Sequence, residues 1–171
     1  MRLTYRLAAA AVPCALAAVL AGVVLAAGAP PVVKAGSTGL GKVLVDSRGH
    51  ALYLFEHDKG TKSTCYGKCA TFWPPLLTSA KATAGSGVKA TLLGTTRRSD
   101  GKLQVTYHGH PLYYFLQDKK AGQTAGQNVD AFGGEWYVVS PAGLKVEKKA
   151  AQAAPGTTTS PSGGGYGNYG G

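Results

Sequence analysis

The chain has 171 residues, with 18 Lys and Arg against 8 Asp and Glu, and a formal net charge of +10 at pH 7. A basic balance favours anionic partners such as cell-wall polymers, lipid headgroups or nucleic acid. The basic residues are scattered, doublets such as Arg97-Arg98 read as solvated surface charge, and no nucleic-acid-binding motif accompanies them, so we exclude a nucleic-acid-binding protein.

Residues 1–29 have the layout of a secretory signal peptide. Arg2 and Arg6 form a basic start, residues 7–27 carry no charge, and small residues lead to Pro30. We predict cleavage of this segment and a secreted or cell-surface protein. The alternative is an uncleaved N-terminal membrane anchor, because a run of about 20 apolar residues spans a bilayer. A membrane partner is expected only in that case.

The rest of the chain divides into one domain and a tail. Residues 150–171 are rich in Gly, Ser, Thr and Pro, with two Tyr. Such a composition buries too little apolar surface to offset chain entropy, so we predict a disordered tail. Residues 36–149 have the length of one ordinary domain.

An internal repeat fills this domain. Residues 41–59 and 101–119 are two copies of one sequence, offset by 60 positions, with ten of 19 paired residues identical and no gap. A repeat identifies the folding unit. We therefore predict that repeat 1 (38–80) and repeat 2 (89–146) pack together as one pseudo-symmetric domain.

In repeat 1, residues 42–46 and 51–56 are rich in Val, Leu, Tyr and Phe and flank a polar turn. This pattern predicts a β-hairpin, whose second strand is apolar on both faces and hence buried on both sides. Residues 65–72 are the one segment with a briefly helical pattern. The Pro74-Pro75 pair that follows predicts an edge strand or a packed extended stretch.

In repeat 2, residues 89–93 are expected to form a strand, followed by a turn at Asp100-Gly101. A second hairpin, 103–107 with 112–116, matches that of repeat 1, and 136–140 forms a further strand. We predict a mainly β fold, a small sandwich or barrel built from two pseudo-symmetric β-hairpin repeats with one short helical turn.

Cys65 and Cys69 are the two cysteines outside the N-terminal segment. In an exported chain, two cysteines this close together most simply form a disulfide. Two alternatives stay open: a thiolate pair that binds a soft metal such as copper or zinc, and a redox-active dithiol.

Two histidines, His50 and His110, occupy the same position in the two repeats. About a twofold axis they would converge on one copper or zinc ion, with Cys65 and Cys69 as further ligands. No spacing in the chain matches an established metal motif. We therefore predict no cofactor and keep these four residues as weak metal candidates.

Each repeat contains a Tyr-x-Phe-x-x-Asp motif, Tyr53-x-Phe55-x-x-Asp58 and Tyr113-x-Phe115-x-x-Asp118. With Cys65-x-Gly67-x-Cys69, Trp73-Pro74-Pro75 and Phe132-Gly133-Gly134-x-Trp136, the chain resembles a bacterial family of exported or lipid-anchored proteins described as secreted repeats of unknown function. The resemblance covers residues 38–143. It implies no reaction and no ligand. The residues that carry it are Tyr53, Phe55, Asp58, Trp73, Tyr113, Phe115, Asp118 and Trp136.

We interpret the repeated aromatic residues as core and the repeated aspartates as turn residues. The alternative is a ligand groove in which they stack a sugar or a flat cofactor. No hydrolase or phosphate-binding motif occurs. We predict a non-enzymatic, β-rich exported module with a structural or binding role at the cell surface, whose partner is an anionic cell-wall polymer or another surface protein. The alternative function is extracytoplasmic electron transfer or metal handling with copper or zinc.

Overall fold

The computed structural model describes Met1 and residues 29–147. The predicted tail and nearly all of the predicted signal peptide lie outside the described residues. In chain order the elements are β1 (Val32–Thr38), β2 (Gly41–Asp46), β3 (Tyr53–Phe55), α1 (Lys68–Phe72), β4 (Leu77–Thr78), β5 (Thr83–Ala84), a 3-10 turn η1 (Ala90–Leu92), β6 (Leu93–Arg97), β7 (Leu103–Tyr107), β8 (His110–Pro111), β9 (Val129–Ala131) and β10 (Gly134–Val138).

The first unit begins with a strand that precedes the expected start of the domain at residue 36. β1 and β2 form an antiparallel hairpin from Thr38↔Gly41 to Val33↔Asp46, and β5 adds to the other edge of β1 in parallel. The predicted hairpin between 42–46 and 51–56 is confirmed only next to its turn, where Val45 bridges Ala51, Asp46 N–H donates to the His50 carbonyl and Leu52 N–H donates to the Leu44 carbonyl. Beyond Leu52 the chain leaves β2 and continues as β3, which pairs with β10.

The second unit is a hairpin of β6 and β7 around the predicted Asp-Gly turn, in which Gly101 has a φ of 80° that favours glycine. The strand predicted at 89–93 is wrong. Residues 90–92 form η1, and the strand that pairs with β7 begins only at Leu93. Of the residues predicted as a strand at 112–116, only Tyr113 forms bridges, to Tyr53 and to Pro75, and the short strand β8 ends just before them.

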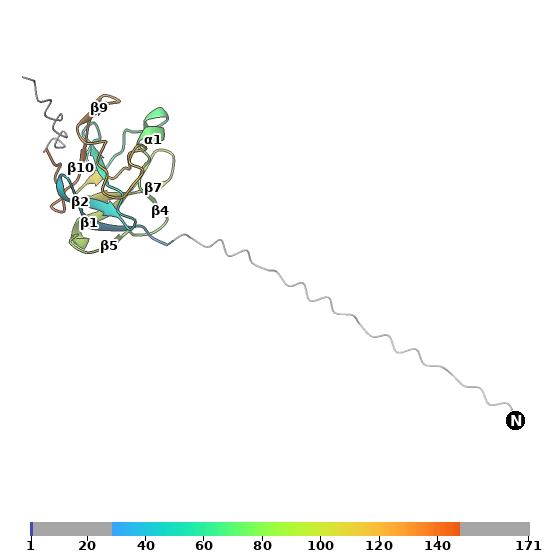
Figure 1. Cartoon of the computed structure of the whole chain (residues 1–171). Coiled ribbons are helices and arrows are strands. Elements are labelled where there is room, and N and C mark those ends of the chain that lie inside the picture. The colour runs from blue at the N-terminus through green and yellow to red at the C-terminus, as the bar shows by residue number, and fades with distance from the viewer. Residues whose placement is uncertain (2–28, 148–171) are drawn as a thin grey trace, which may run out of the picture.

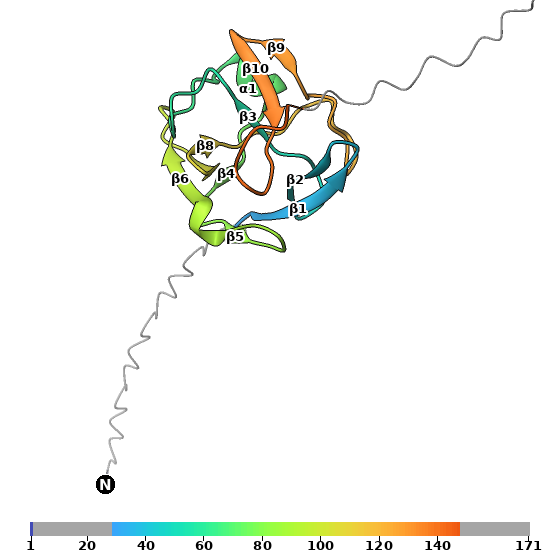
Figure 2. The same ribbon diagram turned by 90° about the vertical axis from the view of Figure 1, so that its left-hand side faces the viewer.

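Two strands of repeat 1 pair with strands of repeat 2. β3 of repeat 1 pairs with β10 of repeat 2, and β4 of repeat 1 pairs with β7 of repeat 2. Figure 2 shows β1 and β2 on one side of β3 and β10, and β6 and β8 on the other. The mainly β class with two related units is confirmed. The strands of residues 29–147 form several small sheets and no closed barrel.

The core has two parts that meet at β3. Tyr53 and Phe55 point into one hydrophobic cluster, and Leu52 and Leu54 into the other. β3 is therefore buried on both faces, as its apolar pattern predicts. The first cluster holds both tryptophans, the motif Tyr and Phe side chains of both repeats and Cys69 of α1. In Figure 1, α1 and β9 lie at the same, upper end of the molecule.

Candidate functional site

The aromatic residues of the two repeats form one stack in which the repeats alternate. Trp73 lies flat on Trp136, with ring centroids 3.9 Å apart and planes 5° apart. Phe55 stacks on the outer face of Trp136 at 4.0 Å, and Phe115 on that of Trp73 at 4.2 Å. All four rings are buried. The order Phe55, Trp136, Trp73, Phe115 means that each repeat supplies every second ring.

The tyrosines of the motif flank this stack and bond across the repeats. Tyr53 donates its hydroxyl hydrogen bond to Asp118 Oδ2 at 2.5 Å, and Tyr113 donates to Asp58 Oδ2 at 2.7 Å. The Tyr53 and Tyr113 backbones also exchange two N–H···O bonds of 2.9 and 3.0 Å. The motif tyrosine of each repeat thus reaches the motif aspartate of the other.

Each aspartate also holds its own loop. Asp58 Oδ1 accepts the backbone N–H of Thr64 at 2.7 Å, and Asp118 Oδ1 accepts that of Ala125 at 2.9 Å. Sequence analysis assigned the aspartates to turns but missed the cross-repeat bonds. The signal was the identical spacing of Tyr and Asp in both copies, which a pseudo-twofold arrangement turns into two reciprocal pairs.

Burial keeps the phenol groups of these pairs protonated. Desolvation and then the Asp118 hydrogen bond raise the pKa of Tyr53, while desolvation and the Asp58 charge raise that of Tyr113. Burial also raises the pKa of Asp58, although hydrogen bonds from Tyr113 and Thr64 work against the rise. The tyrosines therefore act as hydrogen-bond donors at neutral pH.

The weak metal candidates do not come together. Cys65 and Cys69 are joined by a disulfide, and both are buried. His50 Nδ1 lies 3.5 Å from Asp46 Oδ2. His110 lines a surface cavity to which His50 does not contribute. In the described part of the chain, no three His, Cys, Asp or Glu side chains are grouped so as to hold a metal ion.

Two surface cavities of similar size lie at equivalent places in the two repeats. The first, which we name the Arg48 cavity, has a volume of about 300 Å³ and is lined by Arg48, His50, Tyr114, Phe115, Asp118 and Lys119. The second, the Glu56 cavity, has a volume of about 310 Å³ and is lined by Leu54, Phe55, Glu56, Asp58, His110 and Lys145. Each combines the histidine of one repeat with the Phe-x-x-Asp of the other. The two histidines are thus placed in separate cavities.

Comparison with protein families matches residues 34–77 and 94–140 to a model described as a secreted repeat of unknown function. The two matched segments together cover more than half of the chain. The chain belongs to this secreted-repeat family. No curated protein and no solved structure matches it. The matched segments are close to the predicted repeats, 38–80 and 89–146, and contain all eight motif residues.

The secreted-repeat core also contains a buried cation that the sequence analysis missed. Arg98 was taken as surface charge, but it is only 4% exposed. Its guanidinium donates to Ser63 Oγ at 2.7 Å, Gln104 Oε1 at 2.6 Å and the Cys65 carbonyl at 2.7 Å. These three acceptors, together with the Asp100 carboxylate 3.6 Å from Nε, compensate the buried charge.

This cation connects the disulfide to one Tyr–Asp pair. Tyr113 Oη lies 2.7 Å from both Asp58 Oδ2 and Ser63 Oγ. Since the phenol has one proton, it donates to the carboxylate, and the Ser63 hydroxyl donates to the phenol oxygen. The equivalent pair, Tyr53 and Asp118, receives instead the backbone N–H of Gly126 at 3.3 Å.

The description of the family as secreted agrees with the predicted extracytoplasmic location. Among the residues that the structure describes, no helix is long and apolar enough to cross a membrane. The choice between a cleaved signal peptide and an N-terminal anchor depends on residues outside the described part and stays a prediction.

Proposed function

We propose that this secreted-repeat protein is a non-enzymatic module that binds an anionic polymer at the cell surface. The observation that carries the proposal is that the polar groups of the family motif are engaged inside the protein. Tyr53 bonds to Asp118 and Tyr113 to Asp58, so the repeated residues stabilise the assembly of the two repeats.

This engagement favours a binding role over catalysis. A general base or nucleophile has to reach a substrate with a free lone pair. In Asp58 and Asp118, both carboxylate oxygens already accept hydrogen bonds from the protein. The tyrosines are fully buried donors.

The charge balance supports an anionic partner. Arg2, Arg6, Lys148 and Lys149 lie outside residues 29–147, which leaves 14 basic against 8 acidic residues, a net charge of +6. Of the carboxylates, Asp46 is buried and Asp58 and Asp118 are bonded to tyrosines. Arg98 is buried as well, so 13 basic residues stand against 5 other acidic ones, which favours association with polyanions.

The test is a binding titration of the full exported chain. The probes are a carboxylated polymer (polygalacturonate), a phosphorylated polymer (polyglycerol phosphate) and neutral dextran. We expect binding to at least one polyanion, weakened by added salt because salt screens exposed charges, and none to dextran. Failure to bind either polyanion at low salt would refute the proposal.

A second candidate is extracytoplasmic electron transfer, and the aromatic stack favours it. Trp73 and Trp136 are in van der Waals contact, and each meets a tyrosine ring edge, at 5.3 Å for Tyr53 and 5.1 Å for Tyr113. A one-electron oxidant that removes an electron from this cluster would leave a tyrosyl radical once the phenol proton moves to the bonded aspartate. Electron paramagnetic resonance after photo-oxidation with a ruthenium(III) complex tests this. The candidate fails if no tyrosyl signal forms, or if the signal persists when both tyrosines are replaced by Phe.

A further inference from the structure

The Arg48 cavity and the Glu56 cavity occupy equivalent positions but differ in charge because the two repeats have diverged. With the 60-residue offset, His50 corresponds to His110 and Asp118 to Asp58, so the frame of the two cavities is shared. Leu116 in the first corresponds to Glu56 in the second. A carboxylate thus projects into one cavity where the other has an apolar side chain.

The cations of the two cavities also differ in availability. In the Glu56 cavity, Lys145 Nζ lies 2.7 Å from Glu56 and 3.2 Å from Glu147, so its charge is neutralised locally. In the Arg48 cavity, the Arg48 side chain is 75% exposed, and one nitrogen, Nε, lies 3.5 Å from Asp46. Lys119 is exposed and forms no ion pair within residues 29–147.

The carboxylate in the Arg48 cavity, Asp118, forms no ion pair with either cation within residues 29–147. Asp118 Oδ2 accepts the Tyr53 hydroxyl and Oδ1 accepts the Ala125 N–H. Both oxygens are therefore directed at donors of the protein. Arg48 and Lys119 remain the charged groups that an incoming ligand can bond.

The apolar wall differs between the cavities as well. Phe115, at one end of the aromatic stack, is 9% exposed and adjoins Leu116, which is 42% exposed. Phe55, at the other end, is 2% exposed. The His57 ring centroid lies 5.7 Å from that of Phe55, and a Cβ on Gly134 would lie 3.2 Å from the Phe55 ring. Gly126 packs on Phe115 in the same way, with a Cβ position 3.0 Å from the ring. The apolar wall that a ligand meets in the Arg48 cavity is therefore mainly the exposed Leu116 side chain.

We propose that the Arg48 cavity binds one acidic sugar unit of an anionic polymer, with the ring against Phe115 and Leu116 and the acidic group at Arg48 and Lys119. Carboxylates and phosphates both match a guanidinium, which can offer them two parallel hydrogen bonds. A volume of about 300 Å³ lies at the small end of ligand sites and suits a single ring. This inference rests on the proposed function and adds the site and the unit that is recognised.

The test uses the full exported chain and short oligomers in a calorimetric titration. Oligogalacturonate supplies carboxylates, oligomers of glucose phosphate supply phosphates, and malto-oligosaccharide is the neutral probe. We expect micromolar to millimolar binding of at least one acidic oligomer. The Arg48→Ala/Lys119→Ala variant should weaken that binding at least tenfold, since it removes both charged contacts.

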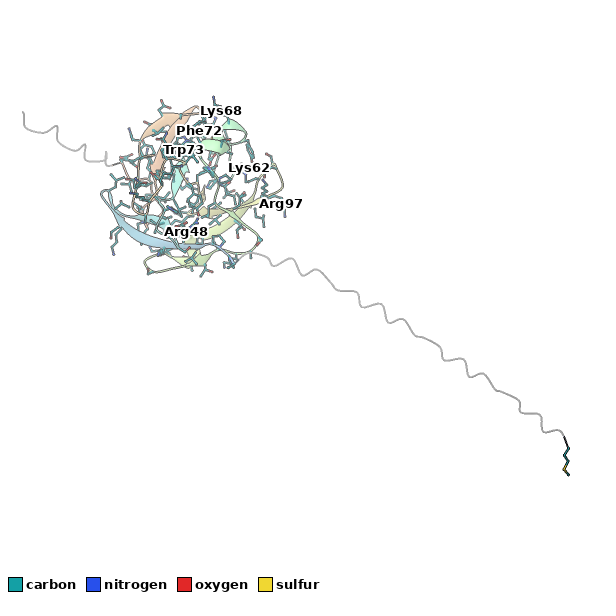
Figure 3. All side chains as sticks on the ribbon, turned by 45° about the vertical axis from the view of Figure 1, so that its right-hand side comes forward. Arg48, Lys62, Lys68, Phe72, Trp73 and Arg97 are labelled. Carbon is teal, nitrogen blue, oxygen red and sulfur yellow. A yellow bond between two sulfur atoms is a disulfide. The ribbon has the colours of Figure 1, made fainter. Side chains whose placement is uncertain are left out.

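Two controls separate the cavity from general charge and from misfolding. Lys62→Ala/Lys68→Ala removes the same charge from a region far from Arg48 (Figure 3) and should change the affinity less than twofold. Leu116→Glu copies the residue of the Glu56 cavity at an exposed position. It should abolish binding of acidic oligomers while the thermal unfolding midpoint stays close to that of the unmodified chain.

The outcomes distinguish the two proposals. Equal losses in the Arg48/Lys119 and Lys62/Lys68 variants would refute the cavity but leave polyanion binding in place. Unchanged binding by Leu116→Glu would also refute the cavity. Binding of the neutral probe as tightly as the acidic ones would refute an acidic ligand. If the unmodified chain binds neither oligomers nor polymers, the proposed function fails together with the site.

Discussion

The Tyr53 hydroxyl and the Asp118 carboxylate lie 65 residues apart in the chain and form one of the shortest hydrogen bonds of the protein, at 2.5 Å. Tyr113 and Asp58 form the equivalent bond, in which the tyrosine belongs to repeat 2 and the aspartate to repeat 1. Both carboxylates are half-buried, and a half-buried carboxylate that loses its donor keeps part of the cost of desolvation without compensation. We therefore expect these two pairs to contribute more to stability than hydrogen bonds at the surface.

For Tyr53→Phe, we predict a loss of about 1–3 kcal/mol in the free energy of unfolding, because Asp118 Oδ2 is left without its donor. Urea denaturation measures this loss. Tyr66→Phe is the control: its hydroxyl accepts an exposed N–H from Ser99, which water can replace, so the change should stay within about 0.5 kcal/mol. Additive losses in Tyr53→Phe combined with Asp118→Asn would show that the two groups are not coupled.

Asp46 gives a prediction about pH. Burial alone would raise its pKa, but N–H bonds from His50 and Arg48 and the nearby His50 ring lower it below 3.8. The folded protein then binds fewer protons at this group than the unfolded chain. Its stabilising effect is complete above 3.8 and is lost as the pH falls through the lowered pKa.

The measurement is the unfolding free energy of Asp46→Asn from neutral pH to below 3.8. Its deficit relative to the unmodified chain should be largest at neutral pH and shrink in acid. Asp130→Asn, which removes an exposed carboxylate, is the control and should retain the pH profile of the unmodified chain. A deficit for Asp46→Asn that does not change with pH would contradict the assignment.

At the scale of elements, the sequence predicts which faces of a strand are buried better than it predicts which strands pair. The alternation in β3 correctly predicts burial on both sides, and Asp100-Gly101 correctly predicts the β6–β7 turn. The partner of β3 is β10, some 80 residues further along, and no local pattern encodes so distant a pairing. Arg98 was misjudged for the same reason, because two of its three acceptors, Ser63 and Cys65, lie 35 and 33 residues away.

In the candidate site, too, the sequence predicts the roles of single residues better than the contacts between distant ones. The repeat predicts that equivalent residues play equivalent roles, and it predicts an inward position for the aromatic rings. It does not predict that the histidine of each repeat faces the aspartate of the other, because that depends on how the repeats cross. The sequence shows that Glu56 corresponds to Leu116, but only the structure shows that these two residues line equivalent cavities.

The loop before β9 packs directly on the aromatic stack, which leads to a prediction at Gly126. A Cβ there would lie 2.7 Å from Trp73 and 3.0 Å from Phe115. We expect Gly126→Ala to cost about 1–3 kcal/mol of stability through overpacking. Gly39→Ala, where a Cβ meets nothing within 4 Å, is the matched control and should be near neutral. Thermal denaturation of both variants checks this; equal midpoints would contradict the tight packing.

At the scale of the whole molecule, neither repeat holds a complete core. Each contributes alternate rings to the stack, and two strands of repeat 1, β3 and β4, lie in sheets whose other strands come from repeat 2. A single repeat would expose these rings and strand edges to water. The domain is therefore one cooperative unit although its sequence is a duplication.

We predict that residues 29–87 and 88–147, produced separately, are unfolded, and that mixing them restores the fold. The division leaves β5 with its partner β1. Near-ultraviolet circular dichroism of the Trp73–Trp136 stack is the measurement, since the signal needs both fragments. The intact chain in urea supplies the unfolded baseline. A strong signal from one fragment alone would contradict the interlocked core.

The reciprocal Tyr–Asp bonds have the form of a contact between identical subunits. In a twofold homodimer, residue i of one copy meets residue j of the other, and j meets i. Tyr53 with Asp118 and Tyr113 with Asp58 reproduce this relation within one chain. Gene duplication and fusion of a one-repeat ancestor that paired with itself explains this arrangement. Fusion then freed the two halves to diverge, and one cavity now has Glu56 where its counterpart has Leu116.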